Sequence, residues 1–402
     1  MNGQAPLAEL SQRLPNCHDY TAKFKCGLAH NNKTKGAYVN DILLLGSGKI
    51  GAIIAEFLTS CGDYNVTVAD LDKDNLARLT PHKNLNTLVL DVTDKAALIS
   101  ALNGKYAALS ACPFNVTKHV ARGAAEQGVH YFDLTEDVAC TNLVKELAKD
   151  AKGALMPQCG LAPGFITIAA YELAKHFDEL HNVHMRVGAL PKYPSNGLKY
   201  NLTWSTDGLI NEYCNPCEAI VEGQLMQVQP LEELESFSLD GVSYEAFNTS
   251  GGLGTLCDTL AGKVKNLNYR TVRYPGHRDI MKMLLHDLRL MDNRPRLKDI
   301  FENALPLTYQ DVVLVFISVS GMKGGQLVQE TYANKVYNKT INGNLWSAIQ
   351  ITTAAGICTA LDLMAQGKLP SQGFVKQEDV LFDDFINNRF GQHYQRSEQT
   401  HP

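Results

Sequence analysis

Three glycines at fixed spacing follow a short apolar run that begins at Ile42. The run reads Ile-Leu-Leu-Leu-Gly-Ser-Gly-Lys-Ile-Gly, so a buried strand leads into a Gly-x-Gly-x-x-Gly turn and then into a helical pattern. Gly46 permits the tight turn, Gly48 lacks the Cβ that would keep the backbone away from a pyrophosphate, and Gly51 lets the helix pack closely on the strand. This context predicts a dinucleotide-binding turn, although an ordinary strand-to-helix turn can carry the same glycines.

Asp70 adds a carboxylate at the spacing that a dinucleotide site requires. It ends the next expected strand, about 20 residues after the glycines, where it would accept hydrogen bonds from the adenosine ribose hydroxyls. Its charge would repel a 2′-phosphate, so the sequence predicts NAD. NADP stays possible, because Lys73 lies just beyond the carboxylate.

Two loops that follow later strands are expected to border the reacting end of this cofactor. Ligands of open α/β sheets bind outside the carboxyl ends of the strands, so Cys112 and Pro113 are expected beside the nicotinamide. Asp133 ends the next strand and offers a proton acceptor there, although it has an equally good interpretation as a helix N-cap or turn residue. The predicted cofactor contacts are Gly46, Ser47, Gly48, Lys49, Ile50, Gly51, Asp70, Cys112 and Pro113.

Short apolar runs that alternate with helical patterns must position these residues. The expected strands are Asp41–Leu45, Asn65–Asp70, Thr87–Leu90, Ala107–Ala111, His130–Leu134 and Ala154–Gln158. The helices expected between them include Ile50–Ser60, Val116–Gln127, with Asn115 as its N-cap, and Cys140–Lys149. The alternation predicts an α/β fold that begins with a Rossmann domain, a doubly wound parallel sheet.

The pattern changes after this domain. Expected strands at Val183–Gly188, Tyr200–Ser205 and Asp311–Ser320 indicate a second, mixed α/β domain, and Leu345–Gln366 reads as a long helix that crosses back to the first. We therefore divide the chain into an N-terminal extension (1–38), the Rossmann domain (39–165), the second domain (166–344) and a C-terminal segment (345–402).

Composition excludes several classes of function. The 402 residues are 45% hydrophobic and 20% charged with a formal net charge of −5, as expected for a globular protein of two or three domains. Without a run of Lys and Arg, a small-molecule partner is expected rather than nucleic acid or a membrane. The ten cysteines are scattered, and neither a signal peptide nor an apolar run of ~18 residues stands out, so a cytoplasmic protein with reduced thiols is expected. Cys214 and Cys217 have C-x-x-C spacing, but no second pair follows at ligand spacing, so no metal site is predicted.

Several segments together resemble a known family. The glycine turn, Ser110-Ala111-Cys112-Pro113-Phe114, Gly128–Asp133, Cys159–Phe165 and Tyr269–His277 are similar to the saccharopine dehydrogenase (glutamate-forming, or saccharopine reductase) and lysine 6-dehydrogenase family, and the similarity extends from residue 40 to 385. One position departs from the family's Gly-Leu-Asp-Pro-Gly turn, because Ala162 replaces the aspartate. Any substrate contact through that carboxylate is therefore missing.

The resemblance implies a homodimer whose second domain binds substrate and forms the dimer contact. It also implies oxidation, or reductive formation, of the C–N bond in the side chain of saccharopine or L-lysine. A base must then take a proton from the amine, and Asp133 is the first candidate, followed by Glu136, Asp137 and His277. Arg273, placed by the resemblance, is expected to bind the substrate carboxylate, although a surface or interface salt bridge is an equally good interpretation; Arg186 is a weaker candidate.

Two other features have both a functional and a purely structural interpretation. The turn Thr249–Leu256 offers backbone N–H groups to a carboxylate or is a plain helix start. Tyr200, Trp204 and Ser205 wall the pocket or belong to the core. Two alternative functions also remain open, a non-catalytic NAD(H)-binding sensor and a carboxynorspermidine synthase-like reductase.

Overall fold

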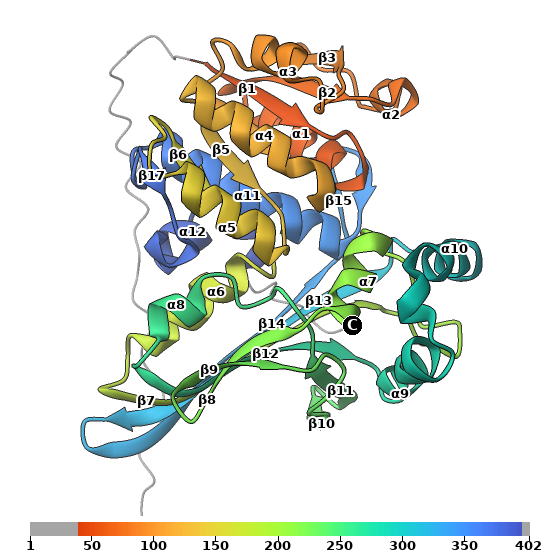
Figure 1. Cartoon of the computed structure of the whole chain (residues 1–402), viewed down its shortest axis with the longest axis vertical. Helices are drawn as coiled ribbons and strands as arrows, with labels where there is room; N and C mark the ends of the chain where they lie inside the picture. Colours follow the sequence, from red (N-terminus) through yellow and green to blue (C-terminus); the bar gives the residue numbers. More distant parts are fainter. Residues whose placement is uncertain (1–38, 396–402) are drawn as a thin grey trace, which may run out of the picture. The chain divides into compact units, whose positions relative to one another are not determined.

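The first of the two large sheets has seven parallel strands, six from the N-terminal part of the sequence and one from the C-terminal segment. The computed structural model describes residues 39–395 (Figure 1), so the predicted N-terminal extension lies outside the described residues. The strands have the order β17-β6-β5-β4-β1-β2-β3. Their bounds are β1 (Asn40–Leu45), β2 (Tyr64–Asp70), β3 (Leu85–Val89), β4 (Ala107–Ser110), β5 (His130–Asp133), β6 (Ala154–Met156) and β17 (Gly373–Phe374). The six strands predicted before residue 160 are all present.

Helices cover both faces of this sheet, as a doubly wound fold requires. They are α1 (Lys49–Cys61), α2 (Lys73–Ala77), α3 (Lys95–Leu102), α4 (Phe114–Gln127) and α5 (Val138–Leu147). Successive side chains of β1 point to opposite faces, so Ile42 and Leu44 enter one core cluster while Leu43 and Leu45 enter another. The predicted N-cap Asn115 is wrong, because Pro113 precedes the first turn of α4 and Asn115 lies within that turn.

A second sheet of eight strands follows α6 (Phe165–Ala174). Its main path is β10-β11-β12-β7-β13-β14, with β8 beside β12 and β9 beside β8. The pair β7 and β12 is parallel and the other pairs are antiparallel, so the sheet is mixed, as predicted. The bounds are β7 (Glu179–Pro191), β8 (Cys217–Val221), β9 (Gln224–Val228), β10 (Glu235–Leu239), β11 (Val242–Asn248), β12 (Val264–Arg273), β13 (Asp311–Lys323) and β14 (Gln326–Tyr337).

The strand predicted at Tyr200–Ser205 is absent. Leu202 makes only an isolated bridge with Leu307, and Ser205 is the N-cap of a helix. Tyr200 and Leu202 instead enter a core cluster formed with helices α7 (Thr206–Cys214), α9 (His277–Lys282) and α10 (Arg294–Ala304). Burial among helices explains the apolar alternation that resembled a strand. The second region also contains α8 (Leu256–Leu260), a π-helical turn at Met283–Asp287 and a 3₁₀ turn at Leu290–Asn293.

The long helix α11 (Ala348–Ala365) connects the two sheets. It contacts α1 and β5 of the first sheet and β13 of the second, and in Figure 1 it lies beside the Rossmann strands. The prediction began the helix too early, because residues 345 and 346 belong to β16 (Asn344–Trp346), which pairs with β15 (Lys339–Ile341). By length and composition α11 is the one helix among residues 39–395 that could span a membrane, and 89% of it is buried inside the fold.

After α11 the polypeptide returns to the first sheet. Strand β17 pairs with β6, and the Gln377 side chain donates to the carbonyl oxygen of Pro157 at 2.9 Å. Helix α12 (Phe382–Ile386) follows. The domain boundaries at residues 165 and 344 stay predictions, because the described residues belong to one compact unit.

Candidate functional site

The glycine turn between β1 and α1 has the geometry of an anion cradle. A Cβ on Gly51 would lie 1.9 Å from the carbonyl oxygen of Gly46, so glycine there is required for close packing of helix on strand. Gly46 has a φ of +96°, which a residue with a side chain rarely adopts. Gly48 is the N-cap of the 13-residue helix α1, offers no capping side chain, and has nothing within 4 Å of the Cβ it lacks. The first amides of α1 are therefore open to a phosphate.

Asp70 lies at the end of β2 beside this turn. Its Oδ2 atom accepts hydrogen bonds from the Ser47 backbone N–H at 2.6 Å and from the Ser47 hydroxyl at 2.7 Å. Its Oδ1 atom accepts from the Asp72 backbone N–H at 2.9 Å. Burial opposes ionisation, but these hydrogen bonds lower the pKa of Asp70 below its ordinary value. The charged carboxylate and the open turn together fit the adenosine ribose and pyrophosphate of a dinucleotide.

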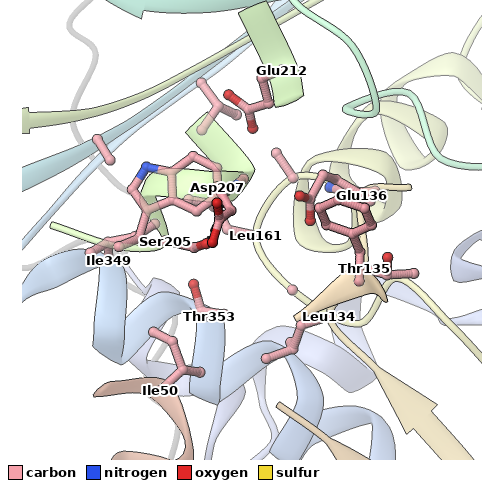
Figure 2. A pocket seen from close by; sticks show the side chains of 18 of the residues that line it. Ile50, Leu134, Thr135, Glu136, Leu161, Ser205, Asp207, Glu212, Ile349 and Thr353 are labelled. Carbon is pink, nitrogen blue, oxygen red and sulfur yellow. Dashed lines mark hydrogen bonds between the residues drawn. The ribbon is translucent and has the colours of Figure 1, made fainter. Parts of the chain in front are cut away.

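A cavity of about 230 Å³ lies at the carboxyl ends of the Rossmann strands and continues into the second domain (Figure 2). On the Rossmann side it is lined by Ile50, the loop Ala111–Phe114 and the loop after β5. Ile349 and Thr353 of α11 also line it, with Thr353 beside Ile50 (Figure 2), and the opposite side is lined by parts of α7, β7 and β12. Cys112 and Pro113 line this cavity, and their contact with a nicotinamide stays a prediction; burial raises the pKa of the Cys112 thiol to about 11.

Two carboxyl groups face this cavity, and neither forms an ion pair among residues 39–395. Figure 2 shows Glu136 on the loop after β5 and Glu212 on α7, and the Glu136 carboxyl group packs against Gly208, one turn before Glu212 on the same helix. Burial, and to a smaller extent Asp137 and Asp133, raise the pKa of Glu136 to about 7. Burial raises the pKa of Glu212 to about 8, although Arg273 opposes this shift. Both groups can therefore exchange protons near neutral pH.

Arg273 ends β12 and contributes a cation to the same cavity. Its Nε donates to the Tyr213 hydroxyl at 2.8 Å, and its Nη1 donates to the Val272 carbonyl oxygen at 2.8 Å. The guanidinium lies 5.0 Å from the centre of the Tyr200 ring. Arg273 thus reaches the cavity as the resemblance implies, fixed from behind by two tyrosines.

His277 lies behind Arg273 and does not line the cavity. Its Nε2 is 3.0 Å from the Tyr213 hydroxyl and its Nδ1 is 2.8 Å from the Leu198 carbonyl oxygen. Burial, with a smaller contribution from Arg273, lowers the pKa of His277 to about 3, so the ring is neutral. This position suits a residue that orients Tyr213 better than a base that meets substrate.

Asp133, the first candidate for the base, is also outside the cavity lining. Its carboxylate accepts hydrogen bonds from the Tyr131 hydroxyl at 2.7 Å and from the backbone N–H groups of Thr135 at 3.0 Å and Gln158 at 2.9 Å. Burial raises its pKa to about 6 despite these bonds. The geometry matches the turn-residue interpretation, because the carboxylate ties together the loops after β5 and β6.

The remaining candidates occupy other places. Asp137 caps α5 by accepting from the Cys140 N–H at 2.7 Å, and Arg186 pairs with Glu235 away from the cavity. The Thr249–Leu256 turn lines a separate small cavity. Trp204 and Ser205 line the main cavity, whereas Tyr200 is buried beside it. Residues 39–395 contain no cluster of three or more His, Cys, Asp or Glu that could hold a metal, and their cysteines are free thiols.

Sequence reasoning missed Glu212. Its segment was not recognised as a helix, although Ser205-Thr206-Asp207 is a good helix start and the Ser205 hydroxyl accepts from the Gly208 N–H at 3.1 Å. With that start, Glu212 would have been placed on α7, but no sequence signal tells which face of α7 meets the cavity.

Comparisons with known proteins agree with this architecture. The model described as the saccharopine dehydrogenase NADP binding domain matches residues 42–156, and the one described as the saccharopine dehydrogenase C-terminal domain matches residues 160–393. A solved structure of apo saccharopine dehydrogenase (L-Glu forming) from Saccharomyces cerevisiae has a TM-score of 0.72 at 17% identity, covering 86% of this chain and 96% of that one. At this identity the likeness shows the fold.

Two curated relatives are similar over part of their length. Mitochondrial alpha-aminoadipic semialdehyde synthase of Bos taurus is 20% identical over 348 residues, which are 81% of this chain and 36% of that protein. Saccharopine dehydrogenase [NADP(+), L-glutamate-forming] of Schizosaccharomyces pombe is 27% identical over 206 residues, which are 48% of this chain and 45% of that protein. The chain therefore spans less than half the length of these relatives.

Proposed function

Because this chain belongs to the saccharopine dehydrogenase family, we propose that it is a nicotinamide-dependent amino-acid dehydrogenase that acts on a C–N bond in the side chain of its substrate. One observation carries the proposal. The loop Ala111–Phe114 on the cofactor side shares a single cavity with Glu136, Glu212 and Arg273. A substrate in this cavity would meet a hydride acceptor, a proton acceptor and a carboxylate-binding cation together.

The residues that line the cavity account for the proton chemistry of such a reaction. A bound nicotinamide ring would accept the hydride. Glu136 lies on the Rossmann side of the cavity, and we assign to it the removal of the proton from the substrate amine, since an ammonium has no lone pair to form the C=N bond. The same carboxyl group then activates the water that adds to the resulting iminium carbon, after which the C–N bond breaks. Asp133, the first candidate for the base, has its oxygens occupied by the surrounding loops.

For the cofactor we propose NAD. The matching family model and the Schizosaccharomyces pombe relative carry NADP in their names, and this favours NADP over NAD. We propose that the Asp70 carboxylate of this chain occupies the position that a 2′-phosphate would need, and its lowered pKa keeps it charged. Initial rates with NAD and NADP test this choice, and a lower KM for NADP would reverse it.

The substrate is proposed to be saccharopine or L-lysine. The assay follows the absorbance of reduced nicotinamide with each compound and each cofactor. A second candidate function, a non-catalytic NAD(H) sensor, is favoured by Ala162, which lines the cavity where the family carries an aspartate. Tight NADH binding without turnover of either compound would support the sensor.

The assembly, the cellular location and the partner of this protein are also proposed. We propose a cytoplasmic homodimer with a small-molecule substrate as its partner, because the family resemblance implies a dimer. Light scattering coupled to size-exclusion chromatography tests the assembly, and a monomeric mass at micromolar concentration would contradict it.

A further inference from the structure

We propose that Glu212 and Arg273 together bind the α-ammonium and α-carboxylate of a free amino-acid head group, so that the substrate is a diamino monocarboxylic acid rather than a tricarboxylate. This inference rests on the proposed function and names the substrate class for the same cavity. It assigns the reacting amine, at the far end of the substrate, to the Glu136 end of the cavity.

Glu212 is a buried carboxyl group with no neighbour to satisfy it. The residue is 8% exposed on α7 and lines the cavity. Among residues 39–395 its carboxylate makes no hydrogen bond or ion pair, whereas other strongly buried acids such as Asp133 and Asp311 accept several backbone N–H groups. A buried carboxylate without such donors is costly unless a ligand supplies them. An ammonium group, with three N–H donors, would do so.

Arg273 supplies the opposite charge beside it. Two of the five N–H groups of its guanidinium are used by Tyr213 and Val272, which leaves three without a partner in the part of the protein that the structure describes. The residue is 2% exposed, and its planar fork matches a carboxylate. A carboxylate and a guanidinium on neighbouring elements of one buried site reproduce, with opposite signs, the charge pair of an amino-acid head group.

The charge balance of the cavity argues against saccharopine. Arg273 is the one cationic side chain among the described lining residues. Asp207 at the rim is balanced from outside by Lys298 at 2.6 Å, while Glu136 adds an unbalanced acid. Saccharopine carries a glutamate moiety on its reacting nitrogen, and the two further carboxylates of that moiety would meet Glu136 instead of a cation. A free ammonium at the end of the substrate is attracted to the same position.

Four probes separate the contacts. L-lysine has both head-group charges, 6-aminohexanoate lacks the α-amine, 1,5-diaminopentane lacks the carboxylate, and saccharopine adds two carboxylates. Oxidation of each is followed with NAD, and binding of each to the NADH complex is followed by the shift in melting temperature. We expect kcat/KM for L-lysine to be at least ~10-fold higher than for each of the other three compounds. L-lysine should also give the largest shift in melting temperature, corresponding to an apparent affinity at least ~10-fold higher.

Two variants test the assignment. Glu212→Gln should raise KM for L-lysine at least ~10-fold and leave KM for 6-aminohexanoate unchanged. Arg273→Gln should also raise KM for L-lysine at least ~10-fold, but leave KM for 1,5-diaminopentane unchanged. The matched control Glu235→Gln disrupts a partly buried Glu–Arg ion pair, with Arg186, outside the cavity. It should leave the ranking of the probes unaltered.

The outcomes are distinguishable from those of the proposed function. If no probe is oxidised while NADH binds, the dehydrogenase proposal fails, and the melting shifts still decide whether the head-group site exists. The head-group inference is overturned if saccharopine is oxidised with the same kcat/KM as L-lysine. It is also overturned if Glu212→Gln weakens the binding of L-lysine and of 6-aminohexanoate equally. In both cases the dehydrogenase proposal stands.

Discussion

The Asp70 carboxylate accepts two hydrogen bonds from a single residue, Ser47, through its backbone N–H at 2.6 Å and its hydroxyl at 2.7 Å. The end of β2 thus fixes the glycine turn and holds a negative charge beside it. Replacing Asp70 by serine removes the charge, so we expect the kcat/KM ratio of NAD to NADP to fall at least ~10-fold.

The control for this change is Asp74→Asn. Asp74 is an exposed acid on the neighbouring helix α2, and its side chain makes no hydrogen bond among residues 39–395. This variant should keep the wild-type ratio. An equal change in both variants would mean that general charge near β2, rather than the Asp70 contact, sets the preference.

Two glycines of the turn should respond in opposite ways to alanine. Gly48→Ala has open space for its methyl group, so the melting temperature should stay near wild type while NADH affinity falls ~10-fold or more, because the methyl occupies the pyrophosphate position. Gly51→Ala forces a methyl to within 1.9 Å of the Gly46 carbonyl oxygen and should cost about 1–3 kcal/mol of stability. Thermal melting and NADH titration measure both effects, and equal destabilisation would contradict the assigned roles.

The base assigned to Glu136 predicts the pH dependence of the reaction. Because burial raises its pKa to about 7, kcat/KM should fall below that pH as the carboxyl group becomes protonated. Its own backbone N–H donates to the carboxylate and lowers the pKa, whereas the charges of Asp137 and Asp133 raise it further. Glu136→Gln should lower kcat by ~10²–10⁴-fold and abolish the acidic limb. A normal limb in this variant would transfer the role to another group.

Glu212 predicts how the stability of the ligand-free protein varies with pH. Its pKa is about 8 in the folded state and 4.5 in the unfolded state, so between these values the folded state binds more protons. The free energy of unfolding therefore falls as the pH rises from 4.5 to 8, by on the order of a few kcal/mol from this group. Arg273 reduces the effect and Glu136 increases it.

The measurement is the difference between wild type and Glu212→Gln. Other buried carboxyl groups, such as Asp133, change stability in the same direction and cancel in the difference. The difference between the melting temperatures at pH 5 and pH 8 should be smaller in Glu212→Gln than in the wild-type protein. Parallel pH curves for the two proteins would show that folding does not raise the pKa of Glu212.

Tyr213 orients Arg273, so its hydroxyl should affect binding more than turnover. Tyr213→Phe removes the acceptor of the Arg273 Nε and the partner of the His277 Nε2. We expect KM for an amino-acid substrate to rise ~10-fold while kcat changes little, since an unsatisfied charged donor costs about 1–3 kcal/mol. A drop in kcat at constant KM would assign the hydroxyl to the chemical step instead.

The Rossmann half was predictable because its signals are local. Each strand is a short apolar run next to a helical pattern, and the turn at Gly46 needs only neighbouring residues to be recognised. The segment Tyr200–Ser205 misled because helices from distant parts of the sequence bury it. Pairings such as β12 with β7 join residues far apart in sequence, and no local pattern encodes them.

Some residues of the candidate site could also be predicted from the sequence and others could not. Cys112 and Pro113 follow directly from a strand end, and Arg273 followed from the family resemblance. Asp133 was predicted to face the cavity, but the backbone amides of Thr135 and Gln158 turn its carboxylate into a loop anchor. Whether a strand-end acid faces a ligand or its own loops depends on how those loops close, which the sequence does not reveal.

The position of β17 has a consequence for how the protein is made. The last strand of the first sheet, Gly373–Phe374, is synthesised more than 200 residues after its neighbour β6, and α11, which covers α1, also comes late. A ribosome that has translated only the cofactor-binding half therefore presents an open β6 edge and an uncovered apolar surface on α1. The first sheet is therefore completed only after the C-terminal segment has been synthesised. Until then we expect its exposed strand edge and apolar surface to need protection by chaperones.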